Sequence, residues 1–309
     1  MRNNKYHFDV PDSKKVRMIV HTDCKNEADD QFALAHHLMT PKFIVEGIVA
    51  GHFDVVHKEY EKGTTAKESL KEVNKVLELM GLASEYKSYL GASTNLKDEF
   101  TPIESEGAKF IVETAMKEDS HPLFIACQGS VTDVASAILM EPKICDRMTV
   151  LWIGGGPYPA GGPEFNVQQD IAAANVLLKS SIPIWQVPSN VYKQMTVSLA
   201  ELELYVRPCG ELGRYLFDQM VEVNEKAAHV PFWPNGETWD LGDSPTIGLL
   251  LESPEKTDIY DEVPAPTINY EDMTYNYDKL GRKIRVYNQV NSRLILNDFF
   301  AKLRLNYGE

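Results

Sequence analysis

The chain has 309 residues, of which 43% are hydrophobic, so it can bury the sizeable core of one large α/β domain or two smaller ones. Its 45 acidic residues outnumber its 31 lysines and arginines, and the resulting charge of −14 excludes the basic face that nucleic-acid or anionic-membrane binding requires. The N-terminus lacks the apolar stretch of a signal peptide, and no run of about 18 apolar residues predicts a membrane span. The four cysteines, Cys24, Cys127, Cys145 and Cys209, show neither zinc-ligand nor disulfide spacing, so the simplest expectation is a cytoplasmic protein with reduced thiols.

Strand-like and helix-like segments alternate over the first two thirds of the chain. The expected strands cover 16–23, 43–51, 87–93, 122–129, 148–156 and 182–189. The expected helices cover 29–39, 59–82, 107–117, 131–142 and 169–181. Because short apolar runs are each followed by a helix, the pattern predicts an α/β fold with a mostly parallel, Rossmann-like central sheet flanked by helices on both faces.

The last third of the chain is expected to be helical first and then to change character. In chain order it predicts a helical region over 198–230 broken at RPCG, a buried helix over 244–253, a β-ribbon over 265–290 and an amphipathic closing helix over 291–305. No internal repeat or low-complexity linker interrupts the sequence. We therefore expect a single domain over 1–309, in which 265–309 forms a small C-terminal appendage.

An acidic turn joins the first expected strand to the first expected helix. Within HTDCKNEADDQ (21–31), Asp23 ends the strand, Asp29 and Asp30 lie on the first helical turn, and Glu27 adds a fourth carboxylate. In open α/β sheets, ligands bind at the carboxyl ends of the strands. The turn is therefore the first candidate for a functional site.

Spacing alone leaves two interpretations of this turn open. Asn26 could be a helix N-cap with Asp29 as its capping-box partner, with the negative charge stabilised by the helix dipole. Alternatively, the repulsion between partly desolvated carboxylates could be balanced by a cation. Carboxylate oxygens without histidine or cysteine companions favour a hard ion such as Ca²⁺ or Mg²⁺.

Other motifs that open an α/β sheet fit less well. Haloacid-dehalogenase-type phosphatases begin with D-x-D, but Asp23, Cys24 and Lys25 lack the second carboxylate. The dinucleotide fingerprint G-x-G-x-x-G is absent after the first strand, and GGGPYPAGG (154–162) does not match the P-loop.

Four stretches of the chain, in their order and spacing, carry a resemblance to a known family. They are HTDCKNEADD (21–30), FIACQGSVTDVASAILMEPKICDRMTVLWIGGGPY (124–158), EFNVQQDIAAANVLLKSSIPIWQVP (164–188) and LGDSPTIGLLL (241–251). Together they resemble the inosine–uridine-preferring nucleoside hydrolases over roughly 16–255, which implies the nucleoside hydrolase fold. The first stretch is similar to the family's D-T-D-P-G-x-D-D, with two extra residues in the turn and with His21 in place of the first Asp.

The resemblance implies a single Ca²⁺ that binds a water and the ribose 2′- and 3′-hydroxyls. Carried over residue by residue, its ligands are the carboxylates of Asp23, Asp30 and Asp243 and the backbone carbonyl of Gln128. The implied substrate-binding residues are Asp29, Glu164, Asn166 and His52, the last of which stands where a ribose-side Asn is typical. Taken singly, Glu164 and Asn166 also suit turn hydrogen bonds, and Asp243 suits a helix N-cap before SPTIGLLL.

Hydrolysis of an N-glycosidic bond passes through an oxocarbenium-like ribosyl centre. It needs a deprotonated water near C1′, a clamp on the ribose and a stabilised leaving base. Asp23 is the candidate general base, because the resemblance implies that it lies beside the metal-held water. Gly242 replaces the histidine that precedes the last Asp in many family members, so His229, Trp239 and Tyr158 remain as candidates for leaving-group stabilisation.

These observations predict a Ca²⁺-dependent N-ribosyl hydrolase that releases a base and ribose from a small ribosylated compound. Two alternatives stay open: a sugar- or metal-binding relative that has lost turnover, and a Mg²⁺-dependent phosphohydrolase. The resemblance further implies a homodimer or homotetramer. The preferred base does not follow from the sequence.

Overall fold

A computed structural model describes residues 5–55, 60–231, 233–277 and 281–308. Eight strands form the central sheet: β1 (Val16–Thr22), β2 (Phe43–Ala50), β3 (Ser88–Leu90), β4 (Leu123–Cys127), β5 (Met148–Ile153), β6 (Ile184–Val187), β9 (Tyr260–Pro264) and β12 (Lys283–Tyr287). The helices that alternate with the first six strands are α1 (Asp30–Met39), α2 (Thr65–Leu79), α3 (Glu106–Ala115), α4 (Thr132–Met140), α5 (Phe165–Gln169) and α6 (Ile171–Lys179). The predicted alternation is confirmed; the expected start of the second helix, at residue 59, lies outside the described residues.

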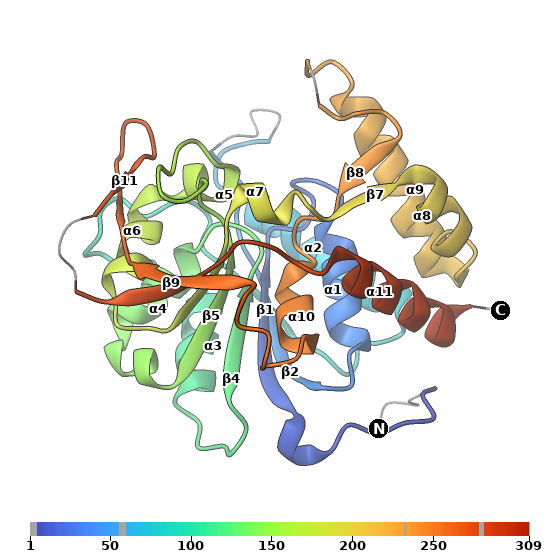
Figure 1. Cartoon of the computed structure of the whole chain (residues 1–309), viewed down its shortest axis with the longest axis horizontal. Helices are drawn as coiled ribbons and strands as arrows, with labels where there is room; N and C mark the ends of the chain where they lie inside the picture. Colours follow the sequence, from blue (N-terminus) through green and yellow to red (C-terminus); the bar gives the residue numbers. More distant parts are fainter. Residues whose placement is uncertain (1–4, 56–59, 232, 278–280, 309) are drawn as a thin grey trace.

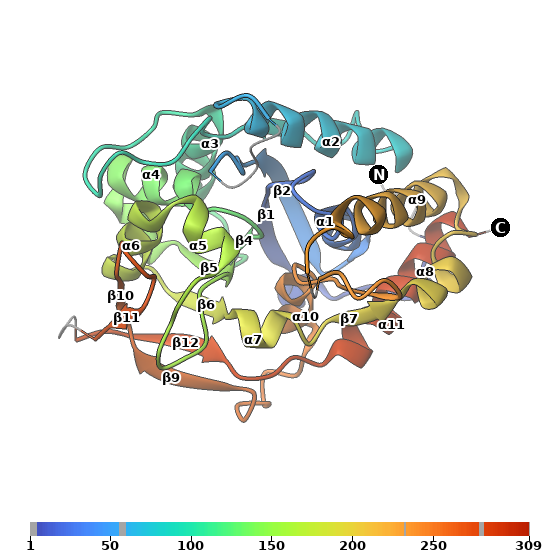
Figure 2. The same cartoon turned by 90° about the horizontal axis from the view of Figure 1, so that it is seen from above.

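The strand order in the sheet is β3-β2-β1-β4-β5-β6-β12-β9. All neighbouring pairs are parallel except β12 and β9, which are antiparallel. Helices cover both faces of the sheet, with α3, α4 and α6 on one side and α1 and α11 (Ser292–Tyr307) on the other (Figure 1 and Figure 2). The predicted α/β class with a mostly parallel central sheet is thus confirmed.

Burial on both faces explains why the strands read as continuous apolar runs. Every residue of β1 is buried, and successive side chains of the strand point to opposite faces. Met18 and Val20 join a core beneath α1, α2 and α11, whereas Ile19 joins a second core beneath α3, α4 and α6. The four cysteines are free, as their spacing predicts, and all four are also buried.

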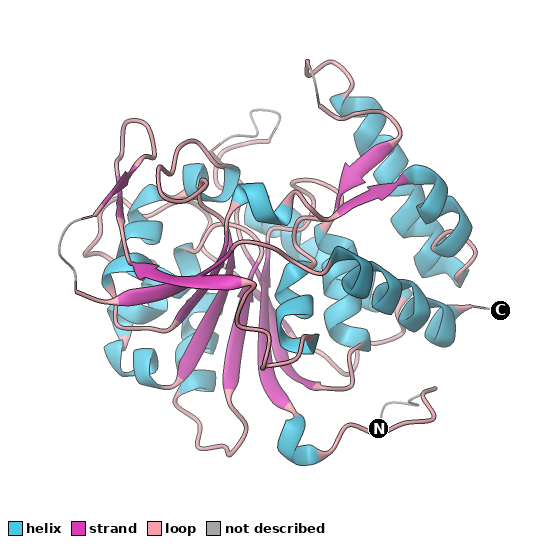
Figure 3. Ribbon diagram, viewed as in Figure 1, coloured by secondary structure: helices cyan, strands magenta, loops and turns pink. Residues whose placement is uncertain are grey.

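The segment after β6 builds a smaller structure beside the sheet. It contains α7 (Ser189–Tyr192), β7 (Thr196–Ser198), α8 (Leu199–Tyr205), α9 (Gly210–Ala227), β8 (Thr238–Asp240) and α10 (Pro245–Leu251). The break expected at RPCG separates α8 from α9. The antiparallel pair of β7 and β8 was not predicted; it stands apart from the central sheet next to α8 and α9 (Figure 3).

The β-ribbon expected over 265–290 divides into two parts. β10 (Thr267–Ile268) and β11 (Tyr275–Asn276) form a short antiparallel pair. In contrast, β12 lies parallel to β6 and extends the central sheet, with β9 on its outer side. The C-terminal segment therefore supplies hydrogen-bond partners for β6, whose backbone groups would otherwise face the edge of the sheet.

The order of the strands creates a crevice at their carboxyl ends. From β1 the chain proceeds outward to β2 and β3, and it then returns to the other side of β1 as β4. In doubly wound sheets such a reversal opens a ligand-binding crevice beyond the strand ends. Residues that directly follow β1 and β4 are thereby brought together. Among the described residues, no helix has the length and apolarity needed to cross a membrane.

Closing helix α11 offers a test of the core. Leu303 is fully buried in the core beneath α1, whereas Leu305 on the same helix is 52% exposed. We expect Leu303→Ala to lower the free energy of unfolding by ~2–5 kcal/mol, because it leaves a cavity in a packed interior. Leu305→Ala should change it by less than about 0.5 kcal/mol. Urea denaturation of both variants measures the difference, and equal losses would contradict this packing.

Candidate functional site

Asp23 lies at the carboxyl end of β1 with its side chain completely buried. Its Oδ1 accepts a hydrogen bond of 2.9 Å from Asn26 Nδ2, and its Oδ2 has no hydrogen-bond partner. A Cβ on Gly129, which follows β4, would lie 2.5 Å from the Asp23 carboxyl carbon. The backbone after β4 can therefore approach Asp23 only because residue 129 is a glycine.

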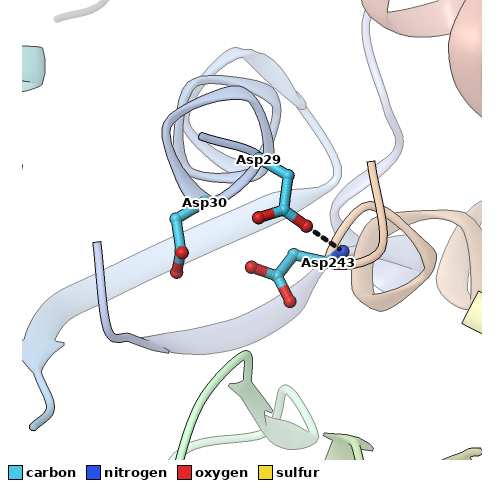
Figure 4. A group of neighbouring side chains, drawn as sticks. All are labelled: Asp29, Asp30 and Asp243. Atoms are coloured by element: carbon cyan, nitrogen blue, oxygen red, sulfur yellow. Dashed lines mark hydrogen bonds between the residues drawn. The ribbon is translucent and has the colours of Figure 1, made fainter. Parts of the chain in front are cut away.

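Three further carboxylates gather beside the first turn of α1 (Figure 4). One oxygen from each of Asp29, Asp30 and Asp243 lies within 4.8 Å of the others. Asp243 comes from the segment before α10, and its backbone N–H donates to Asp29 Oδ2 at 3.2 Å. Asp30 Oδ1 accepts a hydrogen bond from Thr22, while its Oδ2 has no partner.

Burial strongly raises the pKa values of these carboxyl groups. For Asp23, Asp30 and Asp243, desolvation is the largest cause, and the neighbouring aspartates raise the pKa values further. Burial also raises the pKa of Asp29 to about 6. Glu27 responds in the same way, with additional contributions from the charges of Asp29 and Asp240. The region therefore disfavours several negative charges at once unless a cation balances them.

The helix-cap interpretation of this turn is wrong. The N-cap residue of α1 is Asp29, and no side chain makes a capping hydrogen bond there. Asn26 instead donates to Asp23. Asp243 is also no cap, because Ser244 is the N-cap residue of α10 and the Asp243 carboxylate points toward Asp29 and Asp30 (Figure 4).

Polar residues that follow β4 and β5 approach the same region. The backbone carbonyls of Gln128 and Ile153 accept hydrogen bonds from Asn166 Nδ2 at 3.5 and 2.9 Å. Gln128 Oε1 is buried without a partner. Glu164 does cap a helix: its carboxylate accepts hydrogen bonds from the backbone N–H groups of Asn166 and Val167 at the start of α5. Its two oxygens also accept hydrogen bonds from the Gly155 backbone N–H and the Tyr192 hydroxyl, which accords with the turn interpretation of Glu164.

A cavity of about 510 Å³ opens beside these side chains. Of the sequence-predicted site residues, its walls contain Asp29, Gln128, Glu164, Asn166, Trp239 and Asp243. Asp23 and Asp30 lie beneath the wall and are completely buried. The structure thus brings together residues from four stretches of sequence that are up to 220 positions apart, as 23 and 243 are.

Three predicted residues lie elsewhere and do not line the cavity. His52 is fully buried, with Nε2 2.8 Å from Thr132 Oγ1. Tyr158 packs against Tyr275 with ring centroids 4.8 Å apart. His229 is exposed after α9, and its ring nitrogen donates to the Lys226 carbonyl at 2.8 Å.

Gly242 and Tyr192 fit together in the cavity wall. A Cβ at position 242 would lie 3.1 Å from Tyr192 Cδ2 and 3.5 Å from Asp29 Oδ2. The Tyr192 hydroxyl donates a hydrogen bond of 2.9 Å to Glu164. Burial and the neighbouring Glu164 carboxylate raise the pKa of Tyr192, so the phenol keeps its proton. The tyrosine ring therefore occupies the space next to the position where the resemblance expects a histidine.

Sequence reasoning missed several residues of the cavity wall. Tyr192 and Lys193 come from the end of α7, Trp233 from the segment before β8, and Asp240 from the end of β8. Trp233 and Trp239 form a ring pair with centroids 4.9 Å apart. No local motif marks these residues. Only Asp240 could have been suspected from the sequence, because it lies two positions before Gly242 and directly before the stretch 241–251.

The chemistry of these side chains fits a hard metal ion. Asp29, Asp30 and Asp243 offer carboxylate oxygens at close range, and the unpartnered Oδ2 atoms of Asp23 and Asp30 are buried polar atoms that lack a hydrogen bond. Hard dications prefer such oxygen ligands. The group of three close carboxylates differs from the ligand set that the resemblance implies. It contains Asp29, which the resemblance assigns to ribose binding, and it does not contain Asp23.

Known proteins resemble this chain both in sequence and in fold. The chain is 27% identical over 115 residues to the pyrimidine-specific ribonucleoside hydrolase RihB of Escherichia coli O17:K52:H18 (strain UMN026 / ExPEC). This match covers 35% of the chain and 36% of RihB, so the chain spans well under half the length of this curated relative.

Two solved structures share the fold over nearly the whole chain. The purine-preferring ribonucleoside hydrolase from Gardnerella vaginalis superposes with a TM-score of 0.73 at 17% identity, covering 94% of this chain and 99% of that one. The plant nucleoside hydrolase PpNRh1 gives a TM-score of 0.68 at 15% identity, covering 93% and 98%. At these identities the likeness concerns the fold alone.

The family profile extends the match from the fold to the sequence. The profile described as inosine-uridine preferring nucleoside hydrolase matches residues 18–291. This range includes the acidic turn, the residues that follow β4 and β5, and Asp243. The chain therefore belongs to the inosine-uridine preferring nucleoside hydrolase family.

Proposed function

We propose that this protein is a Ca²⁺-dependent N-ribosyl hydrolase, which cleaves the N-glycosidic bond of a ribonucleoside or similar ribosylated compound to base and ribose. The observation that supports this proposal most strongly is the group of close carboxylates of Asp29, Asp30 and Asp243 at the wall of a cavity. Buried Asp23 lies next to this group. Asn166 and Trp239 line the same cavity, which offers a hydrogen-bonding wall and an aromatic wall for a nucleoside.

The metal would be held by Asp23, Asp30, Asp243 and the backbone carbonyl of Gln128, with Asp29 close enough to share in the site. When bound, a hard dication supplies an oriented, acidified water and a positive charge near the ribose hydroxyls. In this proposal Asp23 accepts the proton of the attacking water at Oδ2, which has no partner within the described chain.

The remaining groups would orient the substrate. Asp29 and Asn166 are suited to bind the vicinal ribose hydroxyls, because the Asp29 carboxylate and the Asn166 amide oxygen can each accept a hydrogen bond from a hydroxyl. Fixing the ring helps it to flatten as positive charge develops at C1′. Trp239 is only 3% exposed and would cover one face of the base and keep water away from it.

The activity is tested by incubation with a panel of purine and pyrimidine ribonucleosides. We expect release of reducing sugar in Ca²⁺, loss of activity after EDTA treatment and recovery when Ca²⁺ is restored. Ribose binding without turnover would favour the non-catalytic alternative. Release of inorganic phosphate from a generic phosphate ester in Mg²⁺ would favour the phosphohydrolase.

The proposed base is tested by Asp23→Asn. Removal of a general base is expected to lower kcat by about 10²–10⁴-fold. The fold should persist, because the change removes one charge from a crowded acidic region. Asp146→Asn, at an exposed position, is the matched control and should leave kcat unchanged. Full activity of Asp23→Asn with an unchanged melting temperature would refute the role of Asp23.

The raised pKa values predict how Ca²⁺ changes stability with pH. The pKa of Asp29 is about 6 in the folded chain, above its ordinary 3.8, so the folded state binds more protons between these values. The metal-free protein should therefore lose stability from this group as the pH rises from 4 toward 7.

Calcium should reverse this loss, because it binds the ionised carboxylates of the folded state. At 100 times its Kd, a ligand adds about 2.7 kcal/mol to the free energy of unfolding. We expect the Ca²⁺-induced rise in melting temperature to be larger at about pH 7.5 than at about pH 5. Asp30→Asn should diminish the rise and Asp146→Asn should not. An equal rise at both pH values would contradict binding at these carboxylates.

A further inference from the structure

The wall of the cavity next to Gly242 has an unusual composition for a site that must release a base. Trp233 and Trp239 form a ring pair there, and Glu27, Asp240 and Lys193 lie on the same wall. No histidine is among the described residues that line the cavity. The wall thus offers aromatic faces and carboxylates, but no imidazole that could give a proton to a departing base.

Tyr192 does not replace the missing proton donor. Its hydroxyl donates to Glu164, and a side chain at position 242 would contact its ring. The tyrosine ring therefore fills the space beside Gly242, and its hydroxyl proton is already engaged in the hydrogen bond to Glu164. Among the described residues of the wall, neither a histidine nor this tyrosine offers a proton to a base that leaves with a negative charge.

The charge of the cavity is strongly asymmetric. Five acidic residues and one lysine line it: Glu27, Asp29, Glu164, Asp240, Asp243 and Lys193. Asp23 and Asp30 are completely buried; Asp23 accepts a hydrogen bond from the lining residue Asn26, and Asp30 follows the lining residue Asp29. A bound dication would balance only part of this acidic surplus. Such a wall attracts a cationic group and repels an additional phosphate, because the field of like charges is concentrated in a hollow.

The tryptophan pair adds a second means of recognising a cation. A cation over an aromatic face within about 6 Å gains ~0.5–2 kcal/mol, and tryptophan is the best aromatic partner. Trp239 is nearly buried and Trp233 is 41% exposed, and both rings line the cavity. Asp240 is adjacent to Trp239 in β8 and is held by a 2.7 Å hydrogen bond from Thr196.

We propose that the substrates of this cavity are ribosides of a cationic base, such as an N-alkylated purine or a pyridinium ring. The inference rests on the proposed N-ribosyl hydrolase function and specifies its substrate class. Trp233, Trp239 and Asp240 bind the positively charged ring, and Glu27 increases the acidic character of the wall.

The chemistry of such a substrate suits a wall whose described residues include no histidine. When the C1′–N bond breaks, its electron pair passes to the ring nitrogen and cancels the positive charge of the base. The water oxygen forms the new bond to C1′, and its proton passes to Asp23. The base departs neutral, so no proton has to be supplied to it.

The test compares 7-methylguanosine with guanosine, which differ by the methyl group that makes the base cationic. We expect kcat/KM for 7-methylguanosine to exceed that for guanosine by about tenfold or more, after subtraction of non-enzymatic hydrolysis. Equal or lower kcat/KM for 7-methylguanosine would overturn the inference and leave the proposed hydrolase function standing.

Variants separate recognition by the wall from the intrinsic lability of the methylated substrate. Asp240→Asn should reduce the ratio of the two kcat/KM values by roughly fivefold. Trp233→Leu should reduce it further, because it removes an aromatic face. Asp146→Asn is the control. A ratio that is unchanged in both Asp240→Asn and Trp233→Leu would attribute the preference to substrate lability and would overturn the inference.

Binding decides the inference if neither compound is cleaved. Absence of cleavage would contradict the proposed function. The shift in melting temperature that each compound causes would then measure the preference of the cavity for one base over the other. A larger shift with 7-methylguanosine, diminished in Asp240→Asn, would support the cationic subsite. Equal shifts would overturn it.

Discussion

Repulsion between carboxylates that are buried together is the constraint on which this site depends. Asp23, Asp29, Asp30 and Asp243 come from the end of β1, the start of α1 and the segment before α10, and all four are buried. Desolvation and like charge both oppose their ionisation. Hydrogen bonds from Asn26, Thr22 and the Asp243 backbone satisfy some of the oxygens, and the unpartnered remainder explains why a cation is the natural complement.

The fold imposes this crowding through the order of its strands. Because the chain reverses direction across the sheet at β1, the residues that follow β1 and β4 face a common crevice. Gly129 permits the backbone after β4 to approach Asp23, and Lys25 adopts a φ of 86° within the longer acidic turn. A left-handed conformation at a lysine is costly, and such strain concentrates at functional sites. In the neighbouring cavity, Tyr192 lies against Gly242 and a tryptophan pair lies on the wall.

Much of the fold was predictable because its physical signals are local. Buried parallel strands give continuous apolar runs, and the helices between them show their own periodicity, so the alternation through β6 followed from sequence. The pairing of β12 with β6 could not be predicted from the sequence. A strand this short has the same alternation of residues whether it belongs to a β-ribbon or adds to the edge of a sheet. The short β7–β8 pair was missed for a related reason, since each of its strands has only three residues.

The sequence by itself determined the family and the identity of the acidic residues, because four motifs in a fixed order carry that information within their own letters. It could not decide which side chains share a wall. Tyr192, Trp233 and Asp240 carry no motif, while His52, Tyr158 and His229, which looked suitable as residue types, lie outside the cavity. Convergence of distant segments depends on sheet order and on the packing of loops, both of which are long-range properties. Only the tertiary structure therefore decided the shape and charge of the cavity beside the acidic group.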